Sequence, residues 1–77
     1  MSRLTPIYWK KLECVFLIDG FPFKRQKGSH RFYTKAGIIR PIVIPAYKTP
    51  LSTHIIKSNL RTAAMSRDRY FELLNDC

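Results

Sequence analysis

Acidic residues are scarce in this chain, and a long central stretch has none. The chain has 14 lysines and arginines but only 5 aspartates and glutamates, which gives a formal net charge of +9. Residues 21–40 carry six cations and no acid. Aromatic residues are interleaved with these cations, at Phe21, Phe23, Phe32 and Tyr33. This pattern favours nucleic acid as the partner over a membrane surface, which would call for a basic amphipathic helix.

Long apolar runs and cysteines are also few. The longest apolar run, Cys14–Ile18, has five residues, whereas a membrane-spanning helix needs about 20. Residues 1–6 lack the features of a secretory signal, so we expect a cytoplasmic protein with no membrane contact. Cys14 and Cys77 have no metal-ligand spacing, and the two histidines do not complete one. We therefore expect free thiols in a reducing cytosol, no metal site and no cofactor.

The length suits one domain with a single core, which we take to span residues 1–77. Apolar residues at helical spacing predict a first helix from Pro6 to about Ile18 or Asp19. Thr5 before Pro6 is typical of a helix start, and Gly20 is typical of the residue that ends one. Its predicted buried face consists of Tyr8, Leu12, Val15 and Phe16, which leaves Leu17 and Ile18 as exposed apolar surface.

Three strands are predicted next, over residues 21–26, 30–34 and 38–44. Gly28 tolerates the positive φ of a tight hairpin between the first two. Pro41 cannot donate to a strand ladder, so the third strand should lie at a sheet edge or carry a bulge. Thr49 and Pro50 predict the start of a second helix that runs to Ala63 or Ala64. Its inner stripe is predicted to contain Leu51, Ile55, Ile56, Leu60 and Ala63.

A short last helix is predicted over residues 67–75, with Ser66 as its cap. The order therefore predicts an α+β fold, α-β-β-β-α, like that of double-stranded-RNA-binding domains. Its three-stranded antiparallel sheet should have helices packed on one face, with a short extra helix at the C-terminus.

Several stretches resemble the HicA family of toxin–antitoxin mRNA interferases. In chain order they are Asp19-Gly20-Phe21, the stretch from Phe23 to His30, Val43-Ile44-Pro45, Leu60 and Ala63 before Met65-Ser66-Arg67, and the stretch from Tyr70 to Leu74. One departure is Ala64, which stands where the family commonly has glycine. The resemblance implies ribosome-independent mRNA cleavage, a catalytic histidine after the Gly-Ser pair, which here is His30, and a HicB-type antitoxin. Because residues 21–40 are basic and contain no acid, we expect this antitoxin to be acidic and to cover His30 and the basic face.

RNA cleavage without a metal needs a base for the 2′-hydroxyl proton, donors for the charged phosphorane and an acid for the leaving oxygen. Imidazole can act as the base near neutral pH. The position of His30 alone also suits a strand-start histidine that hydrogen-bonds the turn, and the basic context with the family resemblance favours the catalyst. Tyr33, a lysine or water are the alternatives for the second proton transfer, and His54 reads as a surface or packing residue.

The residues that we assign to RNA binding are Lys24, Arg25, Lys27, Gly28, Ser29, Arg31 and Arg40. Two hypotheses remain open at this point. The first is a small endoribonuclease toxin that uses His30. The second is a non-catalytic RNA- or DNA-binding module that uses the same basic hairpin. Only the placement of His30 in the Gly-Ser-His stretch favours the enzyme.

Overall fold

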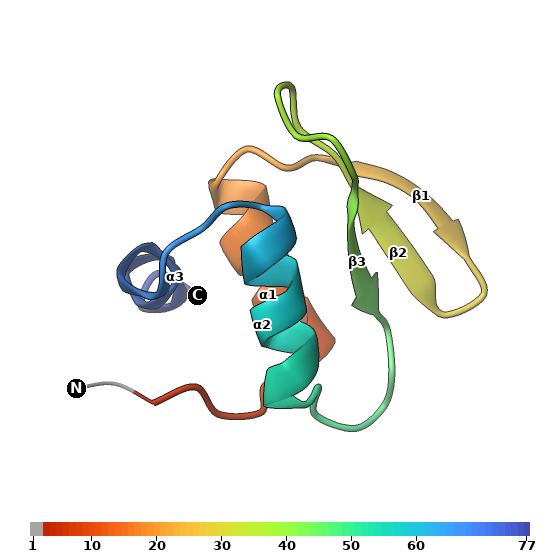
Figure 1. Cartoon of the computed structure of the whole chain (residues 1–77). Coiled ribbons are helices and arrows are strands. Elements are labelled where there is room, and N and C mark those ends of the chain that lie inside the picture. Colours follow the sequence, from red (N-terminus) through yellow and green to blue (C-terminus); the bar gives the residue numbers. More distant parts are fainter. Residues whose placement is uncertain (1–2) are drawn as a thin grey trace.

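The computed structural model describes residues 3–77 and has an α+β fold (Figure 1). Three strands form one antiparallel sheet in the order β1-β2-β3. The elements are α1 (Trp9–Ile18), β1 (Phe23–Lys27), β2 (His30–Tyr33), β3 (Ile42–Pro45), α2 (Thr53–Thr62) and α3 (Arg67–Leu74). This confirms the predicted α-β-β-β-α layout with an extra C-terminal helix. Within residues 3–77, no helix is both long and apolar enough to cross a membrane.

The hairpin between β1 and β2 has the predicted tight turn. Lys27 pairs directly with His30 across the hairpin, so only Gly28 and Ser29 form the turn. Gly28 has φ +60°, the left-handed conformation that suits glycine at this turn. An irregularity in the register between Phe23 and Arg25 leaves Lys24 without a direct partner on β2.

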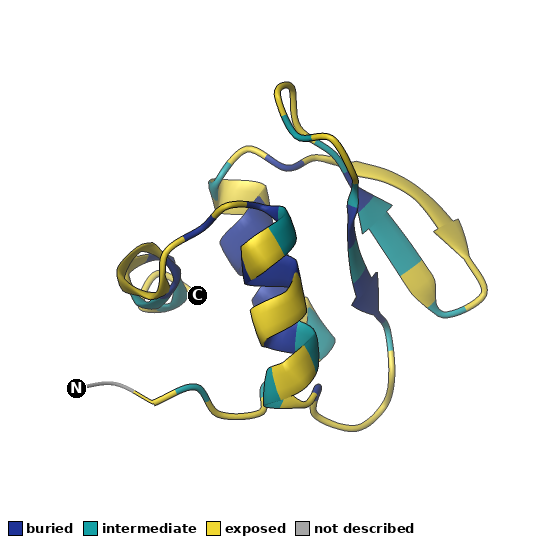
Figure 2. Cartoon of the chain, viewed as in Figure 1, coloured by how far each residue is buried: buried dark blue, intermediate teal, exposed yellow. Residues whose placement is uncertain are grey.

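The core lies between the helices and one face of the sheet (Figure 2). Three residues of α1, Leu12, Val15 and Phe16, are fully buried. Ile42 and Ile44 of β3 are buried with them in the same cluster. Burial of this apolar surface is the main force that holds the sheet to the helices. The hairpin projects away from the helices, and every residue of β1 is exposed.

Both longer helices begin later than the sequence predicted. α1 begins at Trp9 rather than Pro6, and α2 begins at Thr53 with Ser52 as its cap. The residues after the two prolines, Ile7 and Leu51, instead form an isolated antiparallel bridge. In it, the Leu51 N–H donates to the Ile7 carbonyl at 2.7 Å. This tertiary pairing outweighs the local Thr-Pro start signals, because it also buries Leu51 in the core.

Of three further predictions about the helices, two are confirmed and one is wrong. Tyr8 is 58% exposed and not part of the core, because it precedes the helix that was expected to bury it. Leu17 and Ile18 are 45% and 48% exposed, as predicted. Ser66 caps α3 by accepting a hydrogen bond from the Arg69 N–H at 3.1 Å, which confirms that cap.

Two helices end on a residue in the left-handed conformation. Gly20, after α1, has φ +91°, as predicted. Ala64, after α2, has φ +54°, and it is the position that the resemblance marked as a departure from glycine. The Met65 N–H then donates to the Leu60 carbonyl at 2.9 Å, which closes the end of the helix. Alanine therefore occupies a backbone conformation in which its Cβ is strained.

All three strands are shorter than predicted, and β2 ends one residue early, at Tyr33. Phe21 lies outside β1, where it is buried in the core, and β1 begins at Phe23. β3 begins at Ile42, directly after Pro41, because the proline has no N–H to extend the ladder. Residues 38–41 form a loop instead, and in it Ile39 is 99% exposed.

The expectation of free thiols is wrong in this structure. Cys14 and Cys77 form a disulfide, with their Cα atoms 6.1 Å apart. The pairing depends on α3, which packs against α1 and returns the C-terminus to the middle of that helix. The two cysteines are 63 positions apart in sequence, and their proximity could not be predicted because local sequence patterns do not indicate where α3 packs.

Candidate active site

The face of the sheet away from α1 is here called the open face. Residues paired directly across antiparallel strands share a face. Lys27, His30 and Pro45 form one such row, and Arg25, Phe32 and Val43 form the next. The Arg25 guanidinium lies 4.8 Å from the centre of the Phe32 ring, a cation–π contact. The open face therefore carries the predicted catalytic histidine together with two of the predicted phosphate-binding cations.

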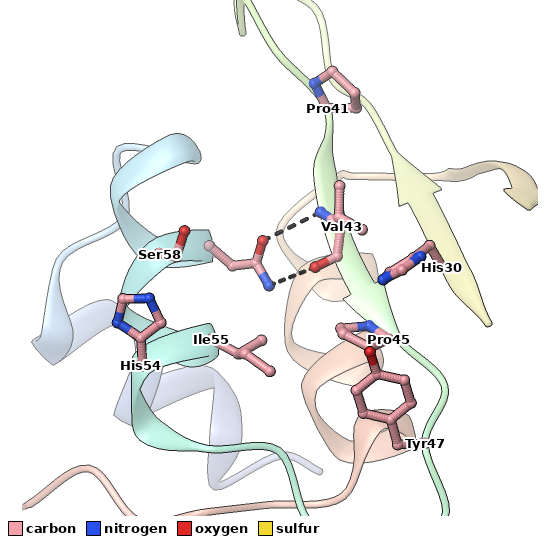
Figure 3. Close-up of a pocket in the computed structure, with 9 residues that line it drawn as sticks. His30, Pro41, Val43, Pro45, Tyr47, His54, Ile55 and Ser58 are labelled. Atoms are coloured by element: carbon pink, nitrogen blue, oxygen red, sulfur yellow. Dashed lines mark hydrogen bonds between the residues drawn. The ribbon is translucent and has the colours of Figure 1, made fainter.

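His30 is exposed at the start of β2 and lines a pocket of about 370 Å³ between the sheet and α2 (Figure 3). Tyr47, from the loop after β3, lies beside it with ring centres 6.4 Å apart. The backbone holds the two rings together, because the Ala46 N–H donates to the Ser29 carbonyl at 2.6 Å. Ser29, directly before His30, and Ala46, directly before Tyr47, are thus joined by a hydrogen bond.

The other wall of the pocket is α2. Asn59 joins the two walls, because its side-chain amide donates to the Val43 carbonyl at 2.8 Å and accepts from the Val43 N–H at 3.2 Å. His54 and Ser58 lie on the helix side of the pocket, and His30 and Tyr47 lie on the sheet side (Figure 3). The two histidines of the chain, 24 positions apart in sequence, therefore line one pocket.

The loop at residues 38–41 lines two further hollows. One, of about 510 Å³, is lined by Lys24, Arg25 and Phe32 and shares Pro41 with the pocket at His30. The other, of about 320 Å³, is lined by Arg40 together with Arg61 of α2. The structure thus brings three predicted RNA-binding cations, Lys24, Arg25 and Arg40, to hollows around one loop.

Arg31 lies on the face opposite His30. Its guanidinium forms an ion pair with Glu13 of α1 at 3.1 Å and donates to Gln26 at 2.7 Å and to the Tyr33 hydroxyl at 3.0 Å. Gln26 in turn donates to the Gly28 carbonyl at 2.9 Å. This series of bonds runs from α1 to the turn, so Arg31 supports the hairpin that carries His30.

The surroundings of Tyr33 explain why it does not reach the pocket. Its side chain is fully buried, and its hydroxyl donates to Glu13. Burial, and then the bond to Glu13, raises the pKa of Tyr33 to about 12. The hydrogen bond with Tyr33 is the main cause that raises the pKa of Arg31. Tyr33, one of the alternatives for the second proton transfer, is therefore removed from that role.

Charge is divided sharply between two parts of the molecule. Residues 20–67 contain ten cations and no acid. The acids lie on or directly after α1 and α3, where Asp19 pairs with Lys35 and Arg69. Within residues 3–77, no ion pair involves the cations of the hairpin, the 38–41 loop and α2, which are Lys24, Arg25, Lys27, Arg40, Lys57 and Arg61.

Sequence reasoning missed Tyr47 and Asn59 and interpreted His54 as a surface or packing residue rather than as a residue of this pocket. The sequence did contain a signal for Asn59, because a polar side chain there lies among the apolar residues of the predicted inner stripe. No local signal existed for Tyr47, because its position depends on the path of a loop. Among residues 3–77, no cluster of histidine, cysteine and acidic residues is suited to hold a metal ion.

The fold and the site define a small basic α+β protein whose exposed histidine lies on an acid-free face. The family model described as the HicA toxin of bacterial toxin–antitoxin systems matches residues 9–65, which is most of the chain. This chain belongs to the HicA toxin family, as its motifs indicated. It is thus a toxin of a toxin–antitoxin system, and an antitoxin is the partner that the family implies. A comparison with curated proteins found no match.

Proposed function

We propose that this toxin is an endoribonuclease that cleaves mRNA without a ribosome and without a metal ion, with His30 as its catalytic residue. The observation that carries the proposal is the setting of His30. The imidazole is exposed, lines a pocket of about 370 Å³ and lies on a face whose cations have no acidic partner among residues 3–77. These cations attract an anionic substrate to the surface on which the His30 imidazole can accept a proton.

The reaction that suits this site is an attack within the substrate. His30 takes the proton of a ribose 2′-hydroxyl, and that oxygen forms a bond to the adjacent phosphorus. The bond from phosphorus to the 5′-oxygen then breaks, and the 5′-oxygen takes a proton from water or from a protonated side chain. The products are a 2′,3′-cyclic phosphate and a free 5′-hydroxyl. Cations on the open face stabilise the phosphorane, which carries more negative charge than the substrate.

We assign the phosphate contacts to two sets of residues. Lys24, Arg25, Lys27 and Arg40 are exposed and have no ion pair within residues 3–77. Gly28 and Ser29 present turn backbone next to His30. Arg31 differs, because Glu13, Gln26 and Tyr33 already occupy its guanidinium. We assign to Arg31 the support of the hairpin and a contribution to the positive field that attracts RNA.

We further propose that the antitoxin is HicB-like and acidic, and that it covers His30 and the basic face. A positive, acid-free surface is a long-range target for a negative partner, so association should be fast and sensitive to salt. Leu17 and Ile18, both exposed, supply a separate apolar contact. Because mRNA is the proposed substrate, we assign the toxin to the cytoplasm.

The function is tested with wild-type protein and His30→Ala, purified in parallel and incubated with RNA in EDTA. We expect the wild type to leave 2′,3′-cyclic phosphate ends and His30→Ala to leave the RNA intact. His30 is exposed, so the variant should unfold at the wild-type temperature. Lys10→Ala on the exposed face of α1 is the matched control and should cleave normally. Equal cleavage by wild type and His30→Ala would remove the catalytic role from His30, whereas no cleavage by either protein would favour the non-catalytic binding module.

Hydrogen exchange tests the antitoxin interface. Free toxin and toxin in the complex are compared, and we expect new protection from Lys24 to Arg31 in the complex. The reason is that a partner which occludes His30 must lie over the hairpin. Protection confined to α3 would mean that the antitoxin inhibits from a distance, and this assignment of the interface would be wrong.

A further inference from the structure

We propose that the pocket between the sheet and α2 receives one unpaired nucleotide of the RNA, with its base stacked on Tyr47. This inference rests on the proposed function, and it narrows the substrate to RNA that is single-stranded at the cleavage site. The ligand class follows from the walls of the pocket. One wall is aromatic, the other carries polar groups, and the floor between them is apolar.

The aromatic wall is positioned for a base next to the bond that His30 would cleave. Tyr47 is 43% exposed, and its ring meets that of His30 at a centre-to-centre distance of 6.4 Å. An exposed ring that lines a pocket offers a face on which a base can stack. The bond between the Ala46 N–H and the Ser29 carbonyl fixes this arrangement from the backbone.

The opposite wall suits the sugar–phosphate part of the same nucleotide. His54 and Ser58 are exposed on the pocket side of α2 and carry a ring N–H and a hydroxyl (Figure 3). Ile55 and Val43 lie between the two walls and provide apolar contact for the edge of a base. Asn59 uses its amide on Val43, so it holds the walls at a set separation.

The size of the pocket suits one unpaired nucleotide better than a base pair. A volume of about 370 Å³ lies within the range of small-ligand pockets, which suits one nucleotide. In an A-form duplex each base is stacked on both faces and paired at its edge. Such a base cannot enter a space between a sheet and a helix unless it first leaves the duplex. The pocket therefore selects RNA with an unpaired nucleotide at this position.

The test measures binding separately from cleavage. The probes are fluorescein-labelled 9-nucleotide oligomers of each base, fully 2′-fluoro substituted, so that the attacking hydroxyl is absent and His30 can stay in place. Fluorescence anisotropy is recorded for wild type, Tyr47→Ala, Tyr47→Phe and Tyr8→Ala. Tyr8 is an exposed tyrosine that does not line this pocket, so it is a matched control.

We expect Tyr47→Ala to weaken binding by about 5- to 150-fold, the range for loss of one base–aromatic stack. Tyr47→Phe and Tyr8→Ala should bind as the wild type does. His54→Ala should weaken binding by about 2- to 12-fold, the range for one hydrogen bond. An abasic site scanned along the best-bound oligomer should weaken wild-type binding at one position and have no effect there in Tyr47→Ala.

Two results would overturn the pocket assignment. One is equal affinity of Tyr47→Ala and Tyr8→Ala for every oligomer. The other is equal affinity of the wild type for an oligomer and for its duplex with a complementary strand. Cleavage of ordinary RNA by the same preparations separates the two proposals. If cleavage depends on His30 while Tyr47→Ala binds RNA normally, the proposed endoribonuclease activity is supported and the proposed nucleotide pocket is wrong. If Tyr47→Ala binds RNA weakly while no preparation cleaves RNA, the proposed nucleotide pocket is supported and the proposed endoribonuclease activity is wrong.

Discussion

Asn59 on α2 satisfies both backbone hydrogen-bonding groups of Val43 on β3 with a single side chain. The amide donates to the carbonyl at 2.8 Å and accepts from the N–H at 3.2 Å. β3 is the last strand of the sheet, so these groups would otherwise form an open edge. Asn59 thus protects the edge and at the same time sets the separation between the walls of the pocket at His30.

Asn59→Ala should therefore affect both stability and RNA binding. We expect the free energy of unfolding to fall by about 1–3 kcal/mol, because two backbone groups lose their partner and Asn59 itself is only 5% exposed. Urea denaturation measures the first effect and anisotropy with labelled RNA the second. Asn75→Ala, an exposed asparagine after α3, is the matched control. Unfolding of both variants at the wild-type urea concentration would contradict the role assigned to Asn59.

Ala64→Gly should stabilise the protein. Ala64 has φ +54°, and an L-residue with a Cβ pays about 1 kcal/mol for this conformation, whereas glycine does not. The midpoint of urea unfolding should rise with an unchanged slope. Ala36→Gly serves as the control, because Ala36 is also exposed and has no positive φ. It should be neutral or destabilising, since glycine there only adds freedom to the unfolded chain. A loss of stability in Ala64→Gly would exclude strain at this position.

Reduction of the disulfide should lower stability by up to about 4 kcal/mol. The bond between Cys14 and Cys77 closes a loop across 63 positions, and the chain-entropy model gives this magnitude for such a loop. The test compares unfolding with and without dithiothreitol in the wild type and in Cys14→Ser/Cys77→Ser. The reductant should act only on the wild type. If it shifts neither protein, the bond does not constrain the unfolded chain.

RNA affinity should fall steeply with salt, because phosphate contacts release counterions. Replacing Lys24 and Lys27 by alanine should flatten the slope of log affinity against log salt by roughly one to two units, at about 0.7 for each single-strand contact. The control pair is Lys10→Ala/Lys11→Ala on α1, which removes the same charge from exposed positions outside the hairpin. If both pairs change the slope equally, only net charge matters and the hairpin is not the binding surface.

Alkaline pH should unfold the protein partly through Tyr70. Burial raises the pKa of Tyr70 to about 12, against 10.0 for the free side chain. The folded state therefore keeps a proton that the unfolded chain loses, so this contribution is complete below pH 10 and is lost as the pH rises to 12. A shift of this size corresponds to about 2–3 kcal/mol. Tyr70→Phe should lose less stability between pH 9 and 11 than the wild type or Tyr8→Phe. Equal losses in all three would exclude titration of Tyr70.

The sequence by itself determined the order of the elements, the hairpin turn at Gly28 and the helix end at Gly20, because each depends on neighbouring residues. It also determined the basic, acid-free character of the hairpin and the family, both of which are properties of composition and motif. Local signals failed at the helix starts after Pro6 and Pro50. There the bridge between Ile7 and Leu51, far apart in sequence, competes with the cap and outweighs it.

Only the tertiary structure decided which side chains meet. The alternation of a strand separates Arg31 from His30, although they are adjacent in sequence, and Glu13 of α1 then holds Arg31 on the far face. Docking of α2 on the edge of β3 brings His54 into the pocket of His30, and docking of α3 on α1 joins Cys14 to Cys77. These contacts depend on how whole elements pack, and packing minimises exposed apolar surface over the entire chain, so no short stretch of sequence specifies them.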